Sequence, residues 1–481
     1  MSSLREKTAR NVSYVAISQG IALILNVAAL AILAGILSPT DFGIAGVGMI
    51  FFNLLYYVQD FGVQSAIIQR DSRIDDSISS GLALRLMFSC ILFAAIALST
   101  PLISDFFEEP ETSLVIIVMT LNLFILAVGF PAQITVTRAL RFSRIAIAGV
   151  AQYVLFALVS VFLALLGFSY WSIVLGTLTG SAAFVAVLVN YERRFFKPKW
   201  DPGLIRELVG FGKHLFVISL MAFVIFNVDQ VIVAKVIGVA MLGIYVLAVR
   251  FGRSLGDQVT GAVNRVLFPT MARIKDEPQR LRTGYLQSLR MISIVVAPLT
   301  MGISAVSPFF VDVILGPNWD EAIAPIAILA FQGLFNSLTA PAMNVLTSIG
   351  KPRIMSMQAV AQAVLIAIGA YPAAVLFGVN GVCALTTIVS AGVVVYYILV
   401  FSRLFNSAPS EVASPMIRPI ASGIIMFALV WAVSLTLSTN VVSLLILVGL
   451  GVIAYFSALY YLSNGNDVRD LRNLIRGTIS R

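Results

Sequence analysis

The sequence predicts an all-α integral membrane protein with about 14 transmembrane helices. Of the 481 residues, 59% are hydrophobic and only 11% are charged, whereas an average soluble domain carries about 25% charged residues. A transmembrane helix needs about 20 mostly apolar residues, and segments of this length follow one another along the chain. The loops between them alternate in charge, which is typical of a chain that crosses the membrane many times.

Fourteen apolar segments are long enough to be spans. The first follows three basic residues and shows no small-residue cleavage site, so we expect a retained span rather than a signal peptide. The expected spans are residues 13–37, 42–66, 77–100, 112–132, 145–166, 169–190, 213–237, 240–263, 286–307, 322–346, 354–376, 380–402, 417–437 and 441–462.

The charges of the loops predict the orientation of the chain. Basic loops include Arg138, Arg141 and Arg144, and a later run from Arg193 to Lys199. The intervening loops are acidic, as at Asp105, Glu108, Glu109, Glu111, Asp312, Asp320 and Glu321. Because basic loops face the cytoplasm, both termini are expected there, and an even number of spans requires the same.

An internal repeat predicts two lobes. Residues 31–74 align with residues 231–274 at an offset of 200 without a gap, and nine positions are identical, among them Gly43 and Gly243. Six spans per repeat is an even number, so the two lobes should have parallel orientation. Transporters built from such repeats bind their substrates between the two halves.

The repeat and the spans together divide the chain into five parts. Within the linker, Leu204, Ile205, Leu208 and Val209 lie on one face of a short helix that we expect at the membrane interface. The parts are an N-lobe of six spans at 1–191, a cytoplasmic linker with this interfacial helix at 192–212, a C-lobe of six spans at 213–405, spans 13 and 14 at 406–463, and a cytoplasmic amphipathic tail at 464–481.

Charged residues inside apolar spans indicate a functional site, because a charge at the membrane centre costs about 2.5–3.5 kcal/mol on insertion scales. Arg250 and Arg253 are one helical turn apart, so we expect them on one face. Arginine is suited to gripping an anion such as phosphate through paired hydrogen bonds. Two local alternatives stay open: Arg253 and Asp257 neutralise each other, and Arg85 bridges to Asp60.

The remaining polar residues in the spans are weaker candidates. Asp229 is a candidate cation or proton site, and a structural hydrogen bond of its carboxylate, to Asn227 or to another helix, is the alternative; Lys235 is expected to extend toward the lipid headgroups. Several amides are candidates for lining a polar path, although each is more often a hydrogen bond between helices. These are Asn26, Asn53, Gln64, Asn122, Gln332 and Asn336.

The composition argues against several classes of function. His214 is the only histidine, and Cys90 and Cys383 lie inside apolar runs, so we expect no metal site, no cofactor and no catalytic residues. The net charge of +9 is accounted for by basic cytoplasmic loops and needs no nucleic acid. A membrane enzyme such as a polysaccharide polymerase would carry catalytic groups on a sizeable outer loop, and all outer loops are short.

A series of segments resembles the bacterial polysaccharide-export flippases of the Wzx type, within the superfamily of multidrug and oligosaccharidyl-lipid exporters. The similarity runs in order over spans 1–12, and spans 13 and 14 match less clearly. The segments are ILSPTDFGIAGVGMIFF (36–52), DFGVQSAIIQR (60–70), TRALRFSRIAIAGV (137–150), MLGIYVLAVRF (241–251), VLFPTMARIKDEPQRLRTGYLQSLR (266–290) and GPNWDEAIAPIAIL (316–329).

This resemblance implies a fold of two six-span lobes around a cavity in the bacterial inner membrane. It also implies transport of an undecaprenyl-diphosphate-linked oligosaccharide from the inner to the outer leaflet, with a proton or sodium ion as a coupling partner. A polymerase and export machinery of the same pathway are expected partners. Arg85, Arg250 and Arg253 would then hold the diphosphate, and Asp60, Asp229, Asp257 and Lys235 would serve in ion coupling or charge pairs. A drug antiporter and a peptidoglycan-precursor flippase of the same superfamily are the alternatives.

The predicted orientation can be tested by labelling cysteines in intact cells. A cysteine in place of Glu108 should react with a membrane-impermeant maleimide, because that loop is expected in the periplasm. A cysteine in place of Lys197 should react only after the cells are opened. The reverse pattern, with position 197 labelled and position 108 protected, would overturn the orientation.

Overall fold

The computed structural model describes residues 18–463 except 19, 23, 195, 257–259, 262–270, 272, 273 and 275, and the side chain of His214. The described part of the chain contains helices and no strand. It divides into two compact units, Met1–Gly243 and Ile244–Arg481. Asp257, the tail at 464–481 and part of the expected first span (residues 13–17, 19 and 23) lie outside the described residues.

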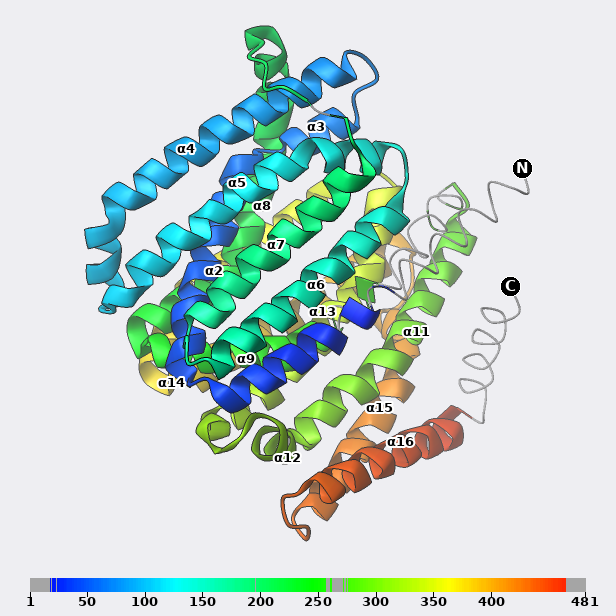
Figure 1. The fold of residues 1–481 in the computed structure, drawn as a ribbon. Helices are drawn as coiled ribbons and strands as arrows, with labels where there is room; N and C mark the ends of the chain where they lie inside the picture. Colours follow the sequence, from blue (N-terminus) through cyan, green and yellow to red (C-terminus); the bar gives the residue numbers. More distant parts are fainter. Residues whose placement is uncertain are drawn as a thin grey trace. The chain divides into compact units, whose positions relative to one another are not determined.

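The first unit consists of long helices joined by short loops. Two pairs, α4 with α5 and α6 with α7, form antiparallel hairpins (Figure 1). The elements are α2 (Pro39–Asp60), α3 (Val63–Ile68), α4 (Ile74–Phe107), α5 (Pro110–Arg138), α6 (Phe142–Leu165), α7 (Trp171–Tyr191), α8 (Pro202–Ile232) and the π-helical segment η1 (Val233–Ile237). The boundary to the second unit falls inside α9 (Val239–Ala248).

The second unit packs five long helices around one apolar core. The core joins α11, α13 and α14 to the last two helices, α15 and α16, which contribute residues such as Met426 and Leu447. The elements are η2 (Val249–Arg253), α11 (Pro278–Ala305), α12 (Ser307–Phe310), η3 (Val311–Leu315), η4 (Pro317–Ala322), α13 (Ile323–Ser348), α14 (Pro352–Leu404), α15 (Pro409–Ser434) and α16 (Val441–Ser463).

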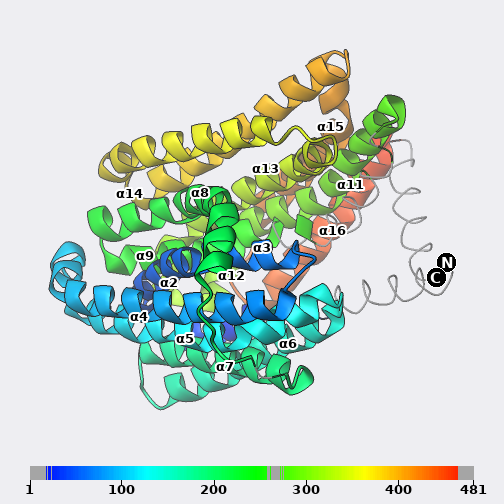
Figure 2. The same ribbon diagram turned by 90° about the horizontal axis from the view of Figure 1, so that it is seen from above.

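Twelve described helices are long and apolar enough to cross a membrane. One of them, α14, has 53 residues, which would extend about 80 Å if it were straight. Gly378 interrupts it with φ 61° and ψ −151°, and a Cβ atom at Gly381 would lie only 2.5 Å from the carbonyl oxygen of Ala373. The chain therefore folds back between the expected spans 354–376 and 380–402 (Figure 2). The exact number of 14 spans stays a prediction, because the first expected span is only partly described.

Several helices start where the sequence supplies a cap. The side chain of Ser38 accepts a hydrogen bond from the backbone N–H of Asp41, and the carboxylate of Asp41 accepts one from the backbone N–H of Ser38, so the two residues form a capping box at the start of α2. Proline occupies the first helical turn of α2, α5, α8, α11, α14 and α15. Proline fits there because the first N–H groups of a helix have no partner within the helix.

The second expected span, 42–66, is broken in the structure. It ends as α2 at Asp60 and resumes as α3 at Val63, because Phe61 and Gly62 take left-handed φ values of 41° and 72°. A helix in lipid must satisfy its backbone groups internally, so such a break needs protein around it. Gly212 of α8 supplies this cover: a Cβ atom there would lie 2.1 Å from the carbonyl oxygen of Phe61.

The expected interfacial helix and the seventh span form a single helix, α8. Its N-terminal part buries Leu204 and Leu208, and Leu208 packs with Val63, Ile67 and Ile78 of α3 and α4. The apolar face predicted for the membrane surface thus contacts other helices of the first unit. Because α8 packs against α3 and α4, the first unit continues past the linker and ends at Gly243. The lobe boundaries drawn from the repeat stay a prediction.

The two equivalent glycines of the repeat lie at one close crossing inside the first unit. A Cβ atom at Gly43 would lie 1.8 Å from the carbonyl oxygen of Val239, and one at Gly243 would lie 1.9 Å from that of Pro39. Positions 39 and 239 are also equivalent in the repeat, so the two contacts are reciprocal. Only glycine allows the two backbones to approach so closely.

Candidate functional site

A buried ion pair lies at the break in the second span. The guanidinium Nη2 of Arg85 on α4 is 3.1 Å from Oδ1 of Asp60, the last residue of α2. The Arg85 side chain is 1% exposed and that of Asp60 is 22% exposed. The other carboxylate oxygen of Asp60 accepts a hydrogen bond from the backbone N–H of Gly62, 3.2 Å away. Of the two alternatives for Arg85, the structure shows the bridge to Asp60.

Two aromatic rings hold the Arg85 guanidinium in place. Its carbon Cζ lies 4.6 Å from the ring centre of Phe130 on α5 and 5.6 Å from that of Tyr56 on α2. A guanidinium over a ring face is attracted by the ring quadrupole, by about 2 kcal/mol or more when the pair is desolvated. The Nε atom of Arg85 is buried and has no hydrogen-bond partner. The site therefore contains a fixed cation with one unused donor.

One buried amide, Gln59, adjoins Asp60 on α2, and a second, Asn122, lies on α5. Gln59 is fully buried and donates through Nε2 to Ser89 Oγ, 2.6 Å away, and to the carbonyl oxygen of Leu123, 2.9 Å away. Its Oε1 atom is buried without a partner, as is Oδ1 of Asn122 on α5. Gln64, the amide predicted from the sequence, is half-buried on α3, whereas Gln59 was not predicted. The signal was present, because Gln59 precedes Asp60 within an apolar run.

The polar residues of α8 are engaged with their surroundings. Asn53 on α2 donates to Asn227 Oδ1 at 3.3 Å, and Asn227 donates to the carbonyl oxygen of Phe223. Asp229 is fully buried, and its Oδ1 accepts a hydrogen bond from the backbone N–H of Gln230 at 2.8 Å. The role of Asp229 in ion coupling stays a prediction.

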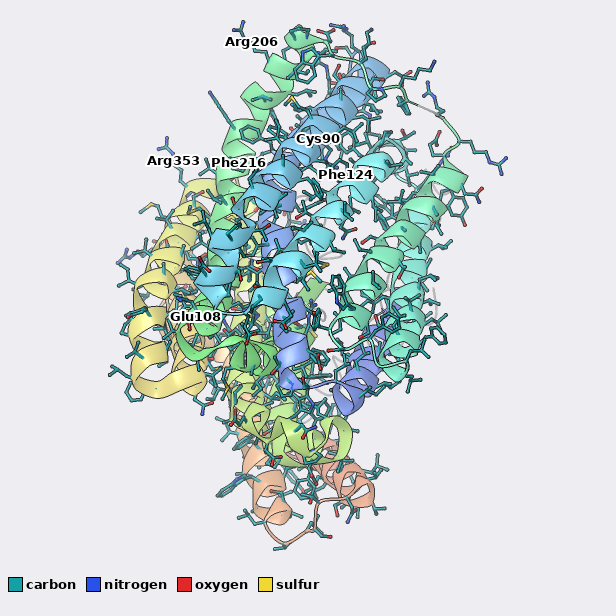
Figure 3. The ribbon with its side chains drawn as sticks, turned by 60° about the vertical axis from the view of Figure 1, so that its left-hand side comes forward. Cys90, Glu108, Phe124, Arg206, Phe216 and Arg353 are labelled. Carbon is teal, nitrogen blue, oxygen red and sulfur yellow. The ribbon has the colours of Figure 1, made fainter. Side chains whose placement is uncertain are left out.

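Lys235 forms an ion pair at the opposite end of the unit from the linker (Figure 3). Its Nζ lies 2.9 Å from Oε1 of Glu108, in the turn between α4 and α5, and 5.3 Å from the ring centre of Phe106. Lys235 was expected to extend toward the lipid headgroups, and in the structure its ammonium group contacts a carboxylate of the same unit. Hydrogen bonding to the lysine lowers the pKa of Glu108, and the positive charge of the lysine adds to this effect.

In the second unit, the two arginines of the predicted pair have different surroundings. Arg250 is exposed, whereas Arg253 is 7% exposed. Both lie in the π-helical segment η2, where each residue turns less about the axis than in an α-helix, so residues three apart no longer share a face. The expectation of a shared face is therefore wrong. Such π-turns are frequent at functional sites.

A close helix crossing fixes the backbone of Arg253. Gly252 and Gly256 pack against α13, where a Cβ atom would lie 2.8 Å from the carbonyl oxygen of Ile326 and 2.5 Å from that of Gly333. Gln332, beside Gly333, is 4% exposed and its Oε1 has no partner, and Asn336 is half-buried one turn later. Arg85 belongs to the first unit, so a common diphosphate site formed by Arg85, Arg250 and Arg253 stays a prediction.

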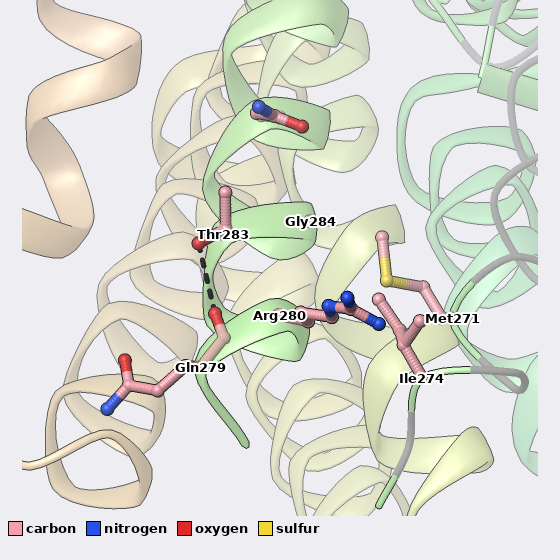
Figure 4. Close-up of a pocket in the computed structure, with 7 residues that line it drawn as sticks. Met271, Ile274, Gln279, Arg280, Thr283 and Gly284 are labelled. Atoms are coloured by element: carbon pink, nitrogen blue, oxygen red, sulfur yellow. Dashed lines mark hydrogen bonds between the residues drawn. The ribbon is translucent and has the colours of Figure 1, made fainter. Parts of the chain in front are cut away.

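A cavity of about 360 Å³ lies at the start of α11 in the second unit (Figure 4). Arg280 points into it and also pairs with Glu277, 2.9 Å away. No residue pattern in the sequence predicted this cavity. Its lining residues are Met271, Ile274, Gln279, Arg280, Thr283, Gly284 and Gln287. Among the described residues, no group of three His, Cys, Asp or Glu side chains is placed to hold a metal ion.

Comparisons with known sequences give one family. A family model described as "Polysaccharide biosynthesis protein" matches residues 32–325. The lipopolysaccharide biosynthesis protein WzxC of Escherichia coli (strain K12) is 24% identical over 345 residues, covering 70% of this chain and 69% of the relative. The succinoglycan biosynthesis transport protein ExoT of Rhizobium meliloti (strain 1021) is 25% identical over 333 residues, covering 67% of this chain and just under two thirds, 65%, of the relative.

Solved structures share the fold at low sequence identity. The lipid II flippase MurJ in an inward closed conformation has a TM-score of 0.74 and 14% identity, and the alignment covers 96% of this chain and 98% of MurJ. An inward-facing multidrug resistance transporter of the MATE family, in the MOP superfamily, has a TM-score of 0.60 and 16% identity, with 83% and 98% covered. Both likenesses concern the fold alone.

The Arg85–Asp60 pair predicts a specific pattern of stabilities. Asp60→Asn and Arg85→Met should each lower the melting temperature of the purified protein, because each leaves one buried charged or polar partner uncompensated. Breaking a fully buried pair costs about 3–5 kcal/mol, and the exposure of Asp60 reduces this. The double variant Asp60→Leu with Arg85→Met should regain most of the loss. If the double variant melts as low as the sum of the single effects, the two side chains are not energetically coupled.

Proposed function

The chain belongs to the family of polysaccharide biosynthesis proteins, and from this premise we propose that it is a flippase for undecaprenyl-diphosphate-linked oligosaccharide repeat units. It would move these units from the cytoplasmic to the periplasmic leaflet of the bacterial inner membrane, with both termini in the cytoplasm. The products would serve exopolysaccharide, capsule or O-antigen synthesis. A polymerase and export machinery of the same pathway would receive the translocated unit.

The observation that carries this proposal is the placement of arginines inside apolar helices. Arg85 and Arg253 are buried and Arg250 is exposed, all within segments apolar enough to cross the membrane. A diphosphate is a compact anion that accepts paired hydrogen bonds from guanidinium groups. Cations inside the membrane are stabilised when they meet such an anion, so they suit a diphosphate lipid better than a cationic drug.

The three arginines would have different parts in transport. Arg250 is accessible and would contact the diphosphate directly. Arg253 lies on the same π-turn with its backbone fixed against α13, so it would set the position of that turn. Arg85 is already paired with Asp60; a diphosphate would have to compete with this carboxylate for the guanidinium, so we assign Arg85 an assisting role.

Coupling to an ion would use the buried carboxylates. Asp229 is fully buried on α8, and Asp60 is partly exposed beside Arg85. Binding of a proton or sodium ion at a buried carboxylate removes its net charge, which lowers the cost of changing its surroundings during alternating access. The half-buried amides Asn26, Asn53, Gln64 and Asn336, with the buried Asn122 and Gln332, would offer hydrogen bonds to sugar hydroxyls.

Two other substrates of the same fold remain as alternatives. A peptidoglycan-precursor flippase also carries a diphosphate lipid, and the similarity of this fold to that of MurJ favours it. A cation-coupled drug antiporter is favoured by the similarity to the MATE fold, but acidic groups rather than arginines suit a cationic drug. A membrane polysaccharide polymerase has less support than either.

Arg250 provides the direct test of substrate binding. Arg250→Ala should weaken binding of an undecaprenyl-diphosphate oligosaccharide to the purified protein by about tenfold or more, because a hydrogen bond to a charged group contributes about 1.5–3 kcal/mol. Arg250→Lys should also weaken it, because a point charge cannot replace two parallel hydrogen bonds. Arg353→Ala removes another exposed arginine of the second unit and should leave binding unchanged. If Arg250→Ala binds the lipid normally but melts earlier, Arg250 is a structural residue.

Asp229 provides the test of ion coupling. Asp229→Asn keeps the size of the side chain and removes its charge, so transport into reconstituted vesicles should lose its dependence on pH or sodium while the folded yield stays similar. Asp312→Asn changes a carboxylate in η3 of the second unit and should keep the ion dependence. An Asp229→Asn protein with unchanged pH and sodium dependence would remove Asp229 from the mechanism.

A further inference from the structure

The segment of residues 193–213 comprises the linker and the first turns of α8. It carries more basic side chains than the nearby acidic side chains can pair with. Four acidic residues near it are engaged by cations, and one of them, Asp76, also meets Arg73 at 3.6 Å. Asp75 pairs with Arg194 at 2.8 Å, Asp76 with Lys199 at 3.0 Å, Asp201 with Arg73 at 2.8 Å, and Glu207 with Arg70 at 2.8 Å. These pairs tie the segment to the loop before α4.

Four further cations of this segment have no ionic partner within the described part of the chain. Lys197, Arg206 and Lys213 are exposed and make no ion pair, and Arg193 makes only a long hydrogen bond, 3.5 Å, to Asn190. Asp71 is the one nearby acidic side chain that is also exposed and unpaired. The surface therefore keeps a positive excess after all internal pairing is complete.

The position of α8 brings this excess to the edge of the membrane. The apolar span within α8 begins at Leu215, directly after Lys213. Arg206 lies two turns earlier on the same face, about 10 Å farther from the hydrocarbon. This distance is comparable to the Debye length at physiological salt, so Arg206 still senses charged headgroups. Figure 3 shows Arg206 at the end of the first unit opposite to Glu108.

Exposed aromatic side chains accompany the cations. Trp200 is 53% exposed and Phe211 is 44% exposed. Aromatic rings with this exposure, next to basic residues at the start of a span, are typical of the headgroup region of a bilayer. A solvated linker would have no use for exposed rings at these positions.

We propose that Arg193, Lys197, Trp200, Arg206, Phe211 and Lys213 form a docking surface for acidic phospholipid headgroups. We call these six residues the linker surface. Its cations meet the negative charge of the headgroups, and its two rings enter the interface beside them. The acidic residues of the region other than Asp71 are held in ion pairs, so the four cations outweigh the one acidic side chain that is left. The proposal is independent of the transported substrate.

Fluorescence quenching at Trp200 tests this proposal. Trp171→Phe and Trp431→Phe remove two other tryptophans, and a matched protein that also carries Trp200→Phe supplies the background from the buried Trp319. The full chain is reconstituted in bilayers that contain brominated phosphatidylglycerol or brominated phosphatidylcholine. We expect the relative binding constant measured at Trp200 to favour phosphatidylglycerol several-fold.

Variants that remove cations from the linker surface, and one variant that frees a cation beside it, make the test specific. The double variant Arg206→Gln with Lys213→Gln should bring the ratio of the binding constants close to one. The double variant Arg193→Gln with Lys197→Gln, which removes the cations that precede Trp200 in the chain, should also lower this ratio. Asp75→Asn releases Arg194 from its ion pair and should raise the ratio. Arg353→Gln removes an exposed cation of the second unit and should leave the ratio unchanged. The elution volume and circular dichroism of each variant establish that it is folded.

Several outcomes would overturn the proposal. Equal quenching by both lipids in the starting protein would show no preference for an acidic headgroup, and little quenching by either lipid would show a solvated linker. A ratio that survives Arg206→Gln with Lys213→Gln and also Arg193→Gln with Lys197→Gln would place the preference elsewhere. Inorganic phosphate and sodium chloride at equal ionic strength should lower the ratio equally; a selective loss in phosphate would indicate a small phosphate site and would also overturn docking on a lipid surface.

Discussion

The need to bury a guanidinium in an apolar helical bundle organises the first unit. Arg85 can lie there because Asp60 offsets its charge and because two rings cover its faces. Asp60 in turn reaches Arg85 from the last turn of α2, where the helix breaks and its carboxylate accepts a backbone N–H from Gly62. The break requires cover from α8, and Gly212 allows that helix to approach. The buried charge of Arg85, the break between α2 and α3, and the close approach of α8 thus depend on one another.

The fold class followed from the sequence because apolar length and loop charge are local properties. The long spans and their order were visible in the residues themselves, whereas the cap at Ser38 places the start of α2 before the expected start at residue 42. The break at Phe61–Gly62 was not, because left-handed φ at a phenylalanine depends on tertiary packing. The π-turn at Arg250 and Arg253 was hidden for the same reason, since a pattern of residue types carries no signal for one extra residue in a turn.

The candidate site was predicted only in part. The pairing of Arg85 with Asp60 was one of two open readings, because a sequence gives the depth of two charges but not whether their helices face each other. Gln59 was missed in favour of Gln64, although Gln59 is the more buried amide. The pair of Lys235 and Glu108 joins residues 127 positions apart, and no periodicity along the chain encodes such a contact. Asp257 lies outside the described residues, so its expected role stays a prediction.

The reciprocal crossing of Gly43 and Gly243 has a consequence for the residues that the repeat tolerates. In a symmetric dimer, residue i of one subunit touches residue j of the other, and j touches i in return. The contacts of Gly43 with Val239 and of Gly243 with Pro39 follow the same rule within the first unit, at an offset of 200. A Cβ atom at either glycine would meet the backbone of the facing segment. A change at one glycine therefore cannot be compensated at its equivalent, and both positions require glycine.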